Sequence, residues 1–243
     1  MSKSLFSWSS GKDASFALFV LLEQGIKPDL LLTTVNKDYG RVSMHGLRNE
    51  LLQLQSKKIG IPLHPVELPA EVSMELYNHI MYEHLTKLRD SGYDTVFFGD
   101  IFLEDLKEFR IRQLKKVGMK AEFPVWKRDT REMAMEIIDN EIKPLVVTVS
   151  AAKLDESYVG REFDRRFLCD LPSDVDWCGE NGEFHTFVYD APFFDSPIDF
   201  TIGEKVYKEY GKCSDKDKKQ GVSPGKSRWE RAFWYVDVLP AEG

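Results

Sequence analysis

The sequence predicts an α/β fold built on a parallel β-sheet. In the first half of the chain, apolar runs of strand length alternate with longer segments whose apolar residues recur at the helical period. This alternation is typical of parallel strands joined by crossover helices. Polar segments also follow several of the apolar runs, and a parallel sheet binds its ligands at the carboxyl ends of its strands. Both observations indicate the same fold.

Four apolar runs are the expected strands of this sheet, and four periodic segments are the expected helices. The strands are residues 5–6, 30–35, 63–68 and 95–98. The helices are residues 46–59, 72–88, 106–117 and a first helix that includes 16–22. Because crossover helices of this size pack on a parallel sheet, we expect both of its faces to be covered.

The pattern changes near residues 124–129, where shorter elements begin. The elements expected after this point are a helix over 130–140, a strand over 144–149, a helical piece over 155–168 and a strand over 233–239. The change predicts two domains, residues 1–126 and residues 127–243. The polar segment 211–228 is rich in Gly, Pro and mixed charge, so we expect a mobile loop there.

The most informative stretch lies between the first strand and the first helix. Three small residues there let a phosphate approach the backbone N–H groups at a helix N-terminus; they are Ser9, Ser10 and Gly11. Lys12 adds a mobile positive charge. Asp13 lies in the first helical turn, where the dipole favours a carboxylate, and it can also hold Mg²⁺. The stretch fits neither a Walker A loop nor a dinucleotide fingerprint. An ordinary strand-to-helix turn is the alternative.

Net charge, the length of the apolar runs and the cysteine spacing indicate which classes of protein are not expected. The 243 residues carry a formal net charge of −7, which argues against general binding to nucleic acid or to anionic membranes. No apolar run approaches the length of a membrane span. The three cysteines show no C-x-x-C spacing, so we expect a reduced, cytoplasmic protein; they are Cys169, Cys178 and Cys213.

Two polar segments follow other predicted strands. In the loop after the second strand, Arg41 and His45 are candidate contacts to a substrate anion, and capping of the next helix is the alternative for His45. After the fourth strand, Asp100 can bind an amine, a ribose hydroxyl or a metal. Arg110 can pair with Asp100 or touch phosphate. The alternative is a turn with a surface salt bridge of little energetic value.

Residues 176–186 form the second dense polar stretch. Its glycines predict a tight turn with carboxylates splayed into a cleft, where Glu180 or Glu183 can act as a general base or bind an ammonium-like group. A hairpin turn with solvated acids is the alternative. Cys178 and His185 have no further ligands at metal spacing, so zinc is not expected. A nucleophilic Cys178–His185 pair is less favoured than a buried, inert cysteine.

Two motifs also carry a family resemblance. G-E-N-G-E-F-H-T-F-V-Y-D-A-P at 179–192 resembles the G-E-G-G-E-x-x-T-x-V-x-D-x-P signature of the diphthine–ammonia ligase family. S-S-G-K-D at 9–13 resembles the S-G-G-x-D-S loop of the PP-loop ATP pyrophosphatases, which include that family; Ser10 and Ala14 replace a glycine and a serine. Further matching motifs extend the resemblance over about residues 3–200. W-S-S-G-K-D and S-M-H-G are most similar to the family's bacterial members.

The resemblance implies a Rossmann-like, adenine nucleotide alpha hydrolase-like domain that binds ATP, followed by a smaller C-terminal α+β domain that binds the acceptor. It implies an ATP-dependent ligase that adenylates a carboxylate, releases AMP and pyrophosphate, and transfers ammonia. ATP and Mg²⁺ are the implied cofactors. The acceptor would be a small molecule or a protein side chain, with a homodimer as a possible assembly. An ATP- or AMP-binding regulatory module without turnover is the alternative, because one fold serves many functions.

The candidate site residues fall into three groups. The expected nucleotide and phosphate contacts are Ser7, Ser9, Ser10, Gly11, Lys12, Asp13, Thr34, Gly99 and Asp100. The expected catalytic residues are Lys12, Asp13, Glu180 and Glu183, with Asp13 also the metal ligand. The expected contacts to the acceptor or ammonia are His45, Arg110, Asn181 and His185.

Overall fold

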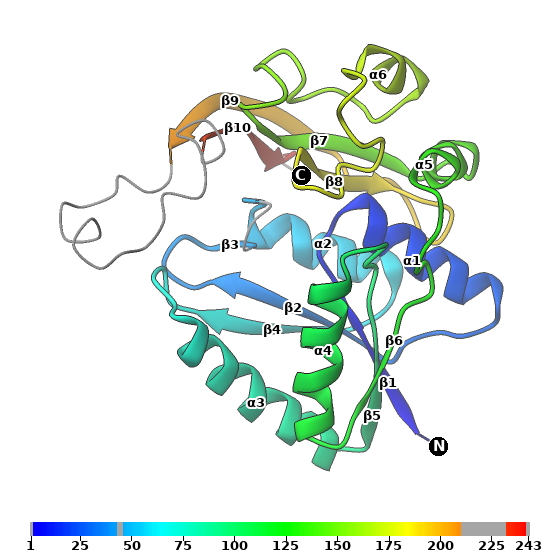
Figure 1. The fold of residues 1–243 in the computed structure, drawn as a ribbon, viewed down its shortest axis with the longest axis vertical. Coiled ribbons are helices and arrows are strands. Elements are labelled where there is room, and N and C mark those ends of the chain that lie inside the picture. The colour runs from blue at the N-terminus through cyan, green and yellow to red at the C-terminus, as the bar shows by residue number, and fades with distance from the viewer. Residues whose placement is uncertain (1, 43–45, 210–231, 242–243) are drawn as a thin grey trace.

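A computed structural model describes residues 2–42, 46–209 and 232–241 (Figure 1). It contains two β-sheets, one in each half of the chain. His45 and the polar segment 211–228 lie outside the described residues. No helix within the described ranges has both the length and the apolar character needed to cross a membrane.

The first sheet is the predicted parallel sheet, and it has a Rossmann-like arrangement. Its parallel strands, in spatial order, are β4 (Leu63–Leu68), β2 (Leu30–Asn36), β1 (Lys3–Ser7), β5 (Tyr93–Phe97) and β6 (Lys120–Glu122). The short strand β3 (Arg41–Val42) runs antiparallel to the end of β2. Strand order reverses between β1 and β5, and this reversal creates the crevice where such sheets bind ligands.

Four helices cover the two faces of this sheet, as the alternating pattern predicts. They are α1 (Lys12–Glu23), α2 (Asn49–Ile59), α3 (Met74–Asp90) and α4 (Glu104–Lys116). Buried residues of α1 and α2 belong to one apolar cluster, whereas α3 and α4 contribute to a second cluster on the opposite face. α1 is apolar on most sides because the second sheet covers its outer face, so that α1 and α2 lie between the two sheets (Figure 1).

The second sheet is antiparallel. Its strands, in spatial order, are β8 (Phe184–Asp190), β7 (Lys143–Ser150), β10 (Ala232–Pro240) and β9 (Phe200–Glu209). Two helices accompany it, α5 (Thr130–Asp139) and α6 (Arg165–Asp170). The expected helical piece over 155–168 is largely wrong, because only α6 is helical. Asp164 caps α6 by accepting a hydrogen bond from the Phe167 N–H at 2.7 Å, and this cap begins the helix late.

The apolar core is continuous across residue 126. One cluster joins Phe6 and Leu18 of the first half to Val147 and Phe187 of the second. Ion pairs also join the halves, since Arg48 Nη2 lies 2.6 Å from Asp237 Oδ2 on β10. The boundary at residues 126–127 remains a prediction.

Candidate active site

A cavity of about 260 Å³ lies at the carboxyl ends of β1, β2 and β5, between α3 and α4. It therefore occupies the crevice where the strand order reverses. Its walls are largely apolar, with Trp8, Val96 and Phe98 among the lining residues. Three residues that we expect at the nucleotide also line it, namely Ser7, Ser9 and Thr34.

Arg110 and Asp100 form one side of this cavity. Arg110 lines it, and its guanidinium lies 4.4 Å from the centroid of the Phe98 ring. Arg110 Nη2 donates to Asp100 Oδ1 at 3.1 Å, and Arg110 Nε donates to Asp100 Oδ2. Of the two contacts considered for Arg110, the structure contains the pair with Asp100. This two-point pairing fixes the plane of the guanidinium beside the cavity.

Gly99 brings the end of β5 against the phosphate loop, residues 9–13. A Cβ atom added to Gly99 would lie 2.9 Å from both Cα and N of Ala14, in the first turn of α1. Such a distance is too short for any side chain, so only glycine permits this contact. Gly99 thus places α1 close to the strand end that also carries Asp100.

Ser10 holds the phosphate loop in an unusual backbone conformation. Its φ is +70°, a left-handed value that costs a residue with a side chain about 1 kcal/mol or more. The Ser10 carbonyl accepts hydrogen bonds from Val188 N at 3.0 Å and Gln55 Nε2 at 3.1 Å. Gln55 is fully buried, accepts from Trp8 Nε1 at 3.0 Å and donates to the Val188 carbonyl at 2.7 Å. One amide therefore joins the residue that follows β1, the loop and β8.

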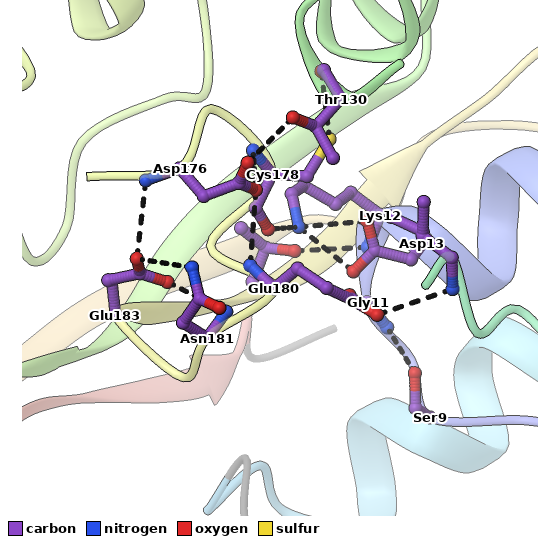
Figure 2. A network of polar contacts seen from close by, with 12 residues as sticks. Ser9, Gly11, Lys12, Asp13, Thr130, Asp176, Cys178, Glu180, Asn181 and Glu183 are labelled. Atoms are coloured by element: carbon purple, nitrogen blue, oxygen red, sulfur yellow. Dashed lines mark hydrogen bonds and ion pairs between the residues drawn. The ribbon is translucent and has the colours of Figure 1, made fainter. Parts of the chain in front are cut away.

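Lys12 points into the second half of the protein (Figure 2). Its Nζ lies 2.9 Å from both Asp13 carboxylate oxygens, donates to the Cys178 carbonyl, and lies 5.1 Å from the centroid of the Phe184 ring. Its backbone N–H donates to Thr186 Oγ1 at 3.0 Å. The side chain is 2% exposed, so the expected mobile cation is instead a buried, paired one.

The electrostatics of this pair favour the charged lysine. Burial is the largest single effect on Lys12 and lowers its pKa, but the negative groups around it, with Asp13 first among them, together raise the pKa of Lys12 above its ordinary value. Burial also raises the pKa of Asp13, and Lys12 opposes that shift. The ion pair is consequently held together in a partly water-excluded site.

The loop 176–183 is tied together by two of its own carboxylates (Figure 2). Asp176 accepts from the N–H groups of Cys178 at 2.9 Å and Glu180 at 3.2 Å, and from Thr130 Oγ1 at 2.6 Å. The carboxylate of Glu183 is buried and accepts from Asp176 N at 3.2 Å, Asn181 N at 2.9 Å and Asn181 Nδ2 at 3.1 Å. Glu183 therefore faces into the turn, not outward into a cleft as expected.

Glu180 is the carboxylate of this loop that reaches the first half. Its Oε1 accepts a hydrogen bond from the Ile101 N–H at 3.2 Å, just after Asp100. Burial, and then the negative charge of Asp13, raise the pKa of Glu180 to about 7. A carboxyl group with this pKa can both accept and donate a proton near neutral pH, as a general acid or base must.

Comparison with known proteins decides the family. A model of the diphthamide synthase N-terminal domain matches residues 2–121, and a model of the diphthamide synthase C-terminal domain matches residues 129–221. This chain belongs to the diphthamide synthase family. The first match covers the first sheet except for the last residue of β6, and the second covers β7, β8 and β9 of the second sheet but not β10.

Curated relatives agree with this family. The diphthine–ammonia ligases of Bos taurus and Homo sapiens are each 28% identical over 132 residues, which cover 52% of this chain and 49% of the relative. The diphthine–ammonia ligase of Schizosaccharomyces pombe is 24% identical over 132 residues, covering 53% of this chain and 22% of the relative. The match thus spans about half the length of the mammalian relatives.

Two further candidate site residues of this diphthamide synthase family member, Cys178 and His185, do not line the cavity. Cys178 Sγ contacts the Thr130 carbonyl at 3.2 Å, and burial raises the pKa of Cys178, so its thiol is not activated. Successive side chains of β8 point to opposite faces. His185 therefore does not share the face of Phe184 and Thr186, which contact Lys12.

Four residues that organise the site were not among the expected site residues. They are Gln55, Thr130, Asp176 and Thr186. Thr186 is the threonine of the family signature at residues 179–192. Thr186 could have been found by asking which polar residues of the signature must hold it together, and Asp176 by asking the same of the polar stretch 176–186. Gln55 stands four residues after Leu51 on the apolar face of α2, and a polar residue at such a position indicates a buried hydrogen bond.

Proposed function

We propose that this protein is an ATP-dependent ligase that joins ammonia to a carboxylate. The supporting observation is the position of Glu180, which the second half of the chain brings to the loop after β5, beside Asp13 and the start of α1. A group able to transfer protons near neutral pH then lies next to the phosphate loop, and a base-sized cavity adjoins the same loop at Ser9.

ATP fits this arrangement with its base in the apolar cavity and its phosphates toward residues 9–13. The N-terminus of α1 favours anions there through its N–H groups and dipole. Mg²⁺ is commonly held by one carboxylate together with substrate phosphates. Asp13, whose side chain is 30% exposed, suits that role, although no group of three or more metal-binding side chains occurs among the described residues. When bound, Mg²⁺ would offset negative charge on the departing pyrophosphate.

The reaction then has two steps. In the first, a carboxylate oxygen of the acceptor attacks the α-phosphorus of ATP, the bond to the bridging oxygen breaks, and pyrophosphate leaves. In the second, ammonia attacks the activated acyl carbon, the acyl–oxygen bond breaks, and AMP leaves. Glu180 accepts the proton that the nitrogen loses. Lys12 and Glu183 position other residues of the site. Lys12 holds Asp13, and Glu183 holds the loop that carries Glu180.

For the acceptor, we propose a chemical class and not a particular compound. The curated relatives are named for diphthine, and we propose the same reaction class here, on a carboxylate of a small molecule or a protein side chain. Arg110 and Asn181 are the described candidates to contact the acceptor. We further propose a cytoplasmic protein, since free thiols such as those of Cys169 and Cys178 persist in reducing compartments. A homodimer is part of this proposal, and light scattering checks it.

Product analysis tests the proposal. The protein is incubated with ATP, Mg²⁺, ammonium chloride and a panel of carboxylates that includes a diphthine-bearing protein. AMP, pyrophosphate and amide should form in equal amounts. Glu180→Gln should slow the reaction strongly, whereas Asp174→Asn, at an exposed carboxylate paired with Lys153, should not. Formation of ADP and phosphate instead of AMP would contradict the proposal.

One observation favours a second candidate, an ATP- or AMP-binding regulatory module. The Lys12 ammonium is bonded to Asp13 and to the Cys178 carbonyl, and a lysine so engaged is less available to a phosphate. This module would bind ATP tightly and release no AMP with any acceptor. Binding measured beside product analysis separates the two candidates.

A further inference from the structure

The cavity is lined by two side-chain amides, and they differ in one respect. Gln113 of α4 is engaged, because its Oε1 accepts a hydrogen bond from Lys116 Nζ at 2.9 Å. Asn78 of α3 is not, because its Oδ1 is buried and has no hydrogen-bond partner among the described residues. One residue that lines the cavity therefore carries a buried acceptor that has no partner among the described residues.

An unused buried acceptor requires an explanation. Leaving such an atom unpaired costs about 1–3 kcal/mol, and native proteins contain few of them. In the part of the chain that the structure describes, three buried side-chain atoms lack a partner, and the other two are Ser15 Oγ and Asn49 Oδ1. Neither of those two residues lines the cavity. Asn78 is thus the member of this group that lines the cavity, and a turn of its side chain would direct Oδ1 toward a ligand there.

The chemistry of Asn78 matches one kind of base edge. An amide offers an acceptor beside a donor. Adenine offers the complement, an exocyclic amino group beside a ring nitrogen, and the two pair through two parallel hydrogen bonds. The apolar neighbours Met81, Leu85 and Val96 keep water from competing, which strengthens hydrogen bonds inside the cavity.

We propose that Asn78 is the residue that selects adenine: Oδ1 accepts from the exocyclic amino group, and Nδ2 donates to the neighbouring ring nitrogen. The proposal rests on the proposed function, because it requires ATP in this cavity. It adds a specificity-determining residue on α3, a helix outside both recognised motifs. A purine that lacks the amino group leaves Oδ1 unpaired and should bind about tenfold to a hundredfold more weakly.

Calorimetric binding without acceptor tests the proposal. ATP is compared with purine riboside triphosphate, which lacks the amino group, on the unaltered protein, Asn78→Leu and Gln113→Leu. The unaltered protein should prefer ATP by about tenfold or more. Asn78→Leu should bind both ligands equally to within about twofold. The amino group of ATP then has no partner, so its presence no longer changes the affinity. Gln113→Leu, the matched amide control, should keep the preference.

Each other outcome overturns the inference in a recognisable way. An undiminished preference for ATP in Asn78→Leu shows that another group reads the base. Equal binding of both ligands by the unaltered protein shows that the base is not read at all. Failure of the unaltered protein to bind either triphosphate overturns the proposed function together with the inference. If Asn78→Leu does not fold, as judged by its thermal melt, Asn78→Ser withdraws the amide with a smaller change and should also lose the preference.

Discussion

The cavity between α3 and α4 leaves space and an unpaired acceptor, whereas the cluster around Lys12 fills its space and pairs its polar atoms with one another. Both regions adjoin the phosphate loop, residues 9–13, because Ser9 lines the cavity and Lys12 and Asp13 belong to the cluster. Asn78 lines a cavity of about 260 Å³ and has an unpaired Oδ1, while Lys12, Asp176 and Glu183 each engage two or more partners.

This difference separates two kinds of contribution to function. A ligand entering the cavity replaces empty space and needs only the side chain of Asn78 to turn for Oδ1, an atom that is costly to leave unpaired, to gain a partner. A ligand that engages Lys12 must first displace Asp13 or the Cys178 carbonyl. We expect the cavity to govern nucleotide affinity, and the cluster to govern stability and the chemical step.

The largest effect on stability should come from Lys12→Met. Removing the ammonium leaves the Asp13 carboxylate without its counterion beside Glu180, and breaking a buried pair in this way costs about 3 kcal/mol. Lys143→Met breaks an exposed pair with Asp190 and should cost no more than about 0.5 kcal/mol. Urea unfolding measures both. Equal costs for the two variants would mean that the cluster is no more than a surface feature.

The next effect concerns Glu180 and pH. Its carboxyl has a pKa of about 7 in the folded protein and 4.5 as its ordinary value, so between these values the folded state binds more protons than the unfolded state. The free energy of unfolding should therefore fall as pH rises from about 4.5 to 7, by about 2 kcal/mol from this group, less than the full shift implies because the residue is partly exposed to solvent.

Glu180→Gln should remove that contribution. Urea unfolding at pH 5 and pH 8 should show a smaller pH-dependent loss in Glu180→Gln than in the unaltered protein. Glu67→Gln, at an exposed position on β4, should keep the full loss. An identical pH response in all three proteins would mean that Glu180 is exposed to water and that its pKa is not raised in the folded protein.

The cavity itself is probed by Met81→Trp. The larger side chain occupies space that a base would need, so ATP binding should weaken at least about tenfold, while stability changes little because the space is open. Tyr82→Trp, one residue further along α3 and exposed, is the matched control and should bind ATP normally. Calorimetry measures both affinities. Unchanged ATP binding by Met81→Trp would show that the nucleotide does not bind in this cavity.

The smallest effect is a gain in stability from Ser10→Gly. Glycine adopts the left-handed backbone without strain, and this gain exceeds its entropic cost by about 0.5 kcal/mol. Ser9→Gly, where no left-handed φ occurs, should instead destabilise the protein by about 0.5–1 kcal/mol. Thermal melts should therefore shift in opposite directions, and shifts of the same sign would show that strain at Ser10 is unimportant.

Much of the first sheet could be predicted because its strands and helices are long enough to repeat a pattern. The helical period of α3 and the apolar run of β2 each span several residues. β3 and β6 have two and three residues, too few to show any period, and neither was predicted. In the stretch 155–168, turn formation at Asp155, which accepts from Ser157 N at 2.8 Å, prevails over helical spacing.

The candidate site was predictable in its residues but not in its contacts. The two motifs identify residues 9–13 and Glu180, and the structure brings them together. No pattern indicates that Lys12 bonds to the Cys178 carbonyl, because that contact joins residues 166 positions apart and depends on how β8 packs against α1. Asn78 was missed for the same reason, since only the folded cavity distinguishes it from Gln113.

Gln55 has a consequence for how this protein can be divided. The family is described by two separate models, which suggests interchangeable modules. Yet one buried amide is bonded simultaneously to Trp8, Ser10 and Val188, and Val188 comes from the later module. A fragment ending near residue 126 would lack that third partner and the β8 N–H that holds Ser10. Chimeras that swap the later module must therefore match it to the earlier one at β8, or the grafted protein will inherit a misshapen phosphate loop.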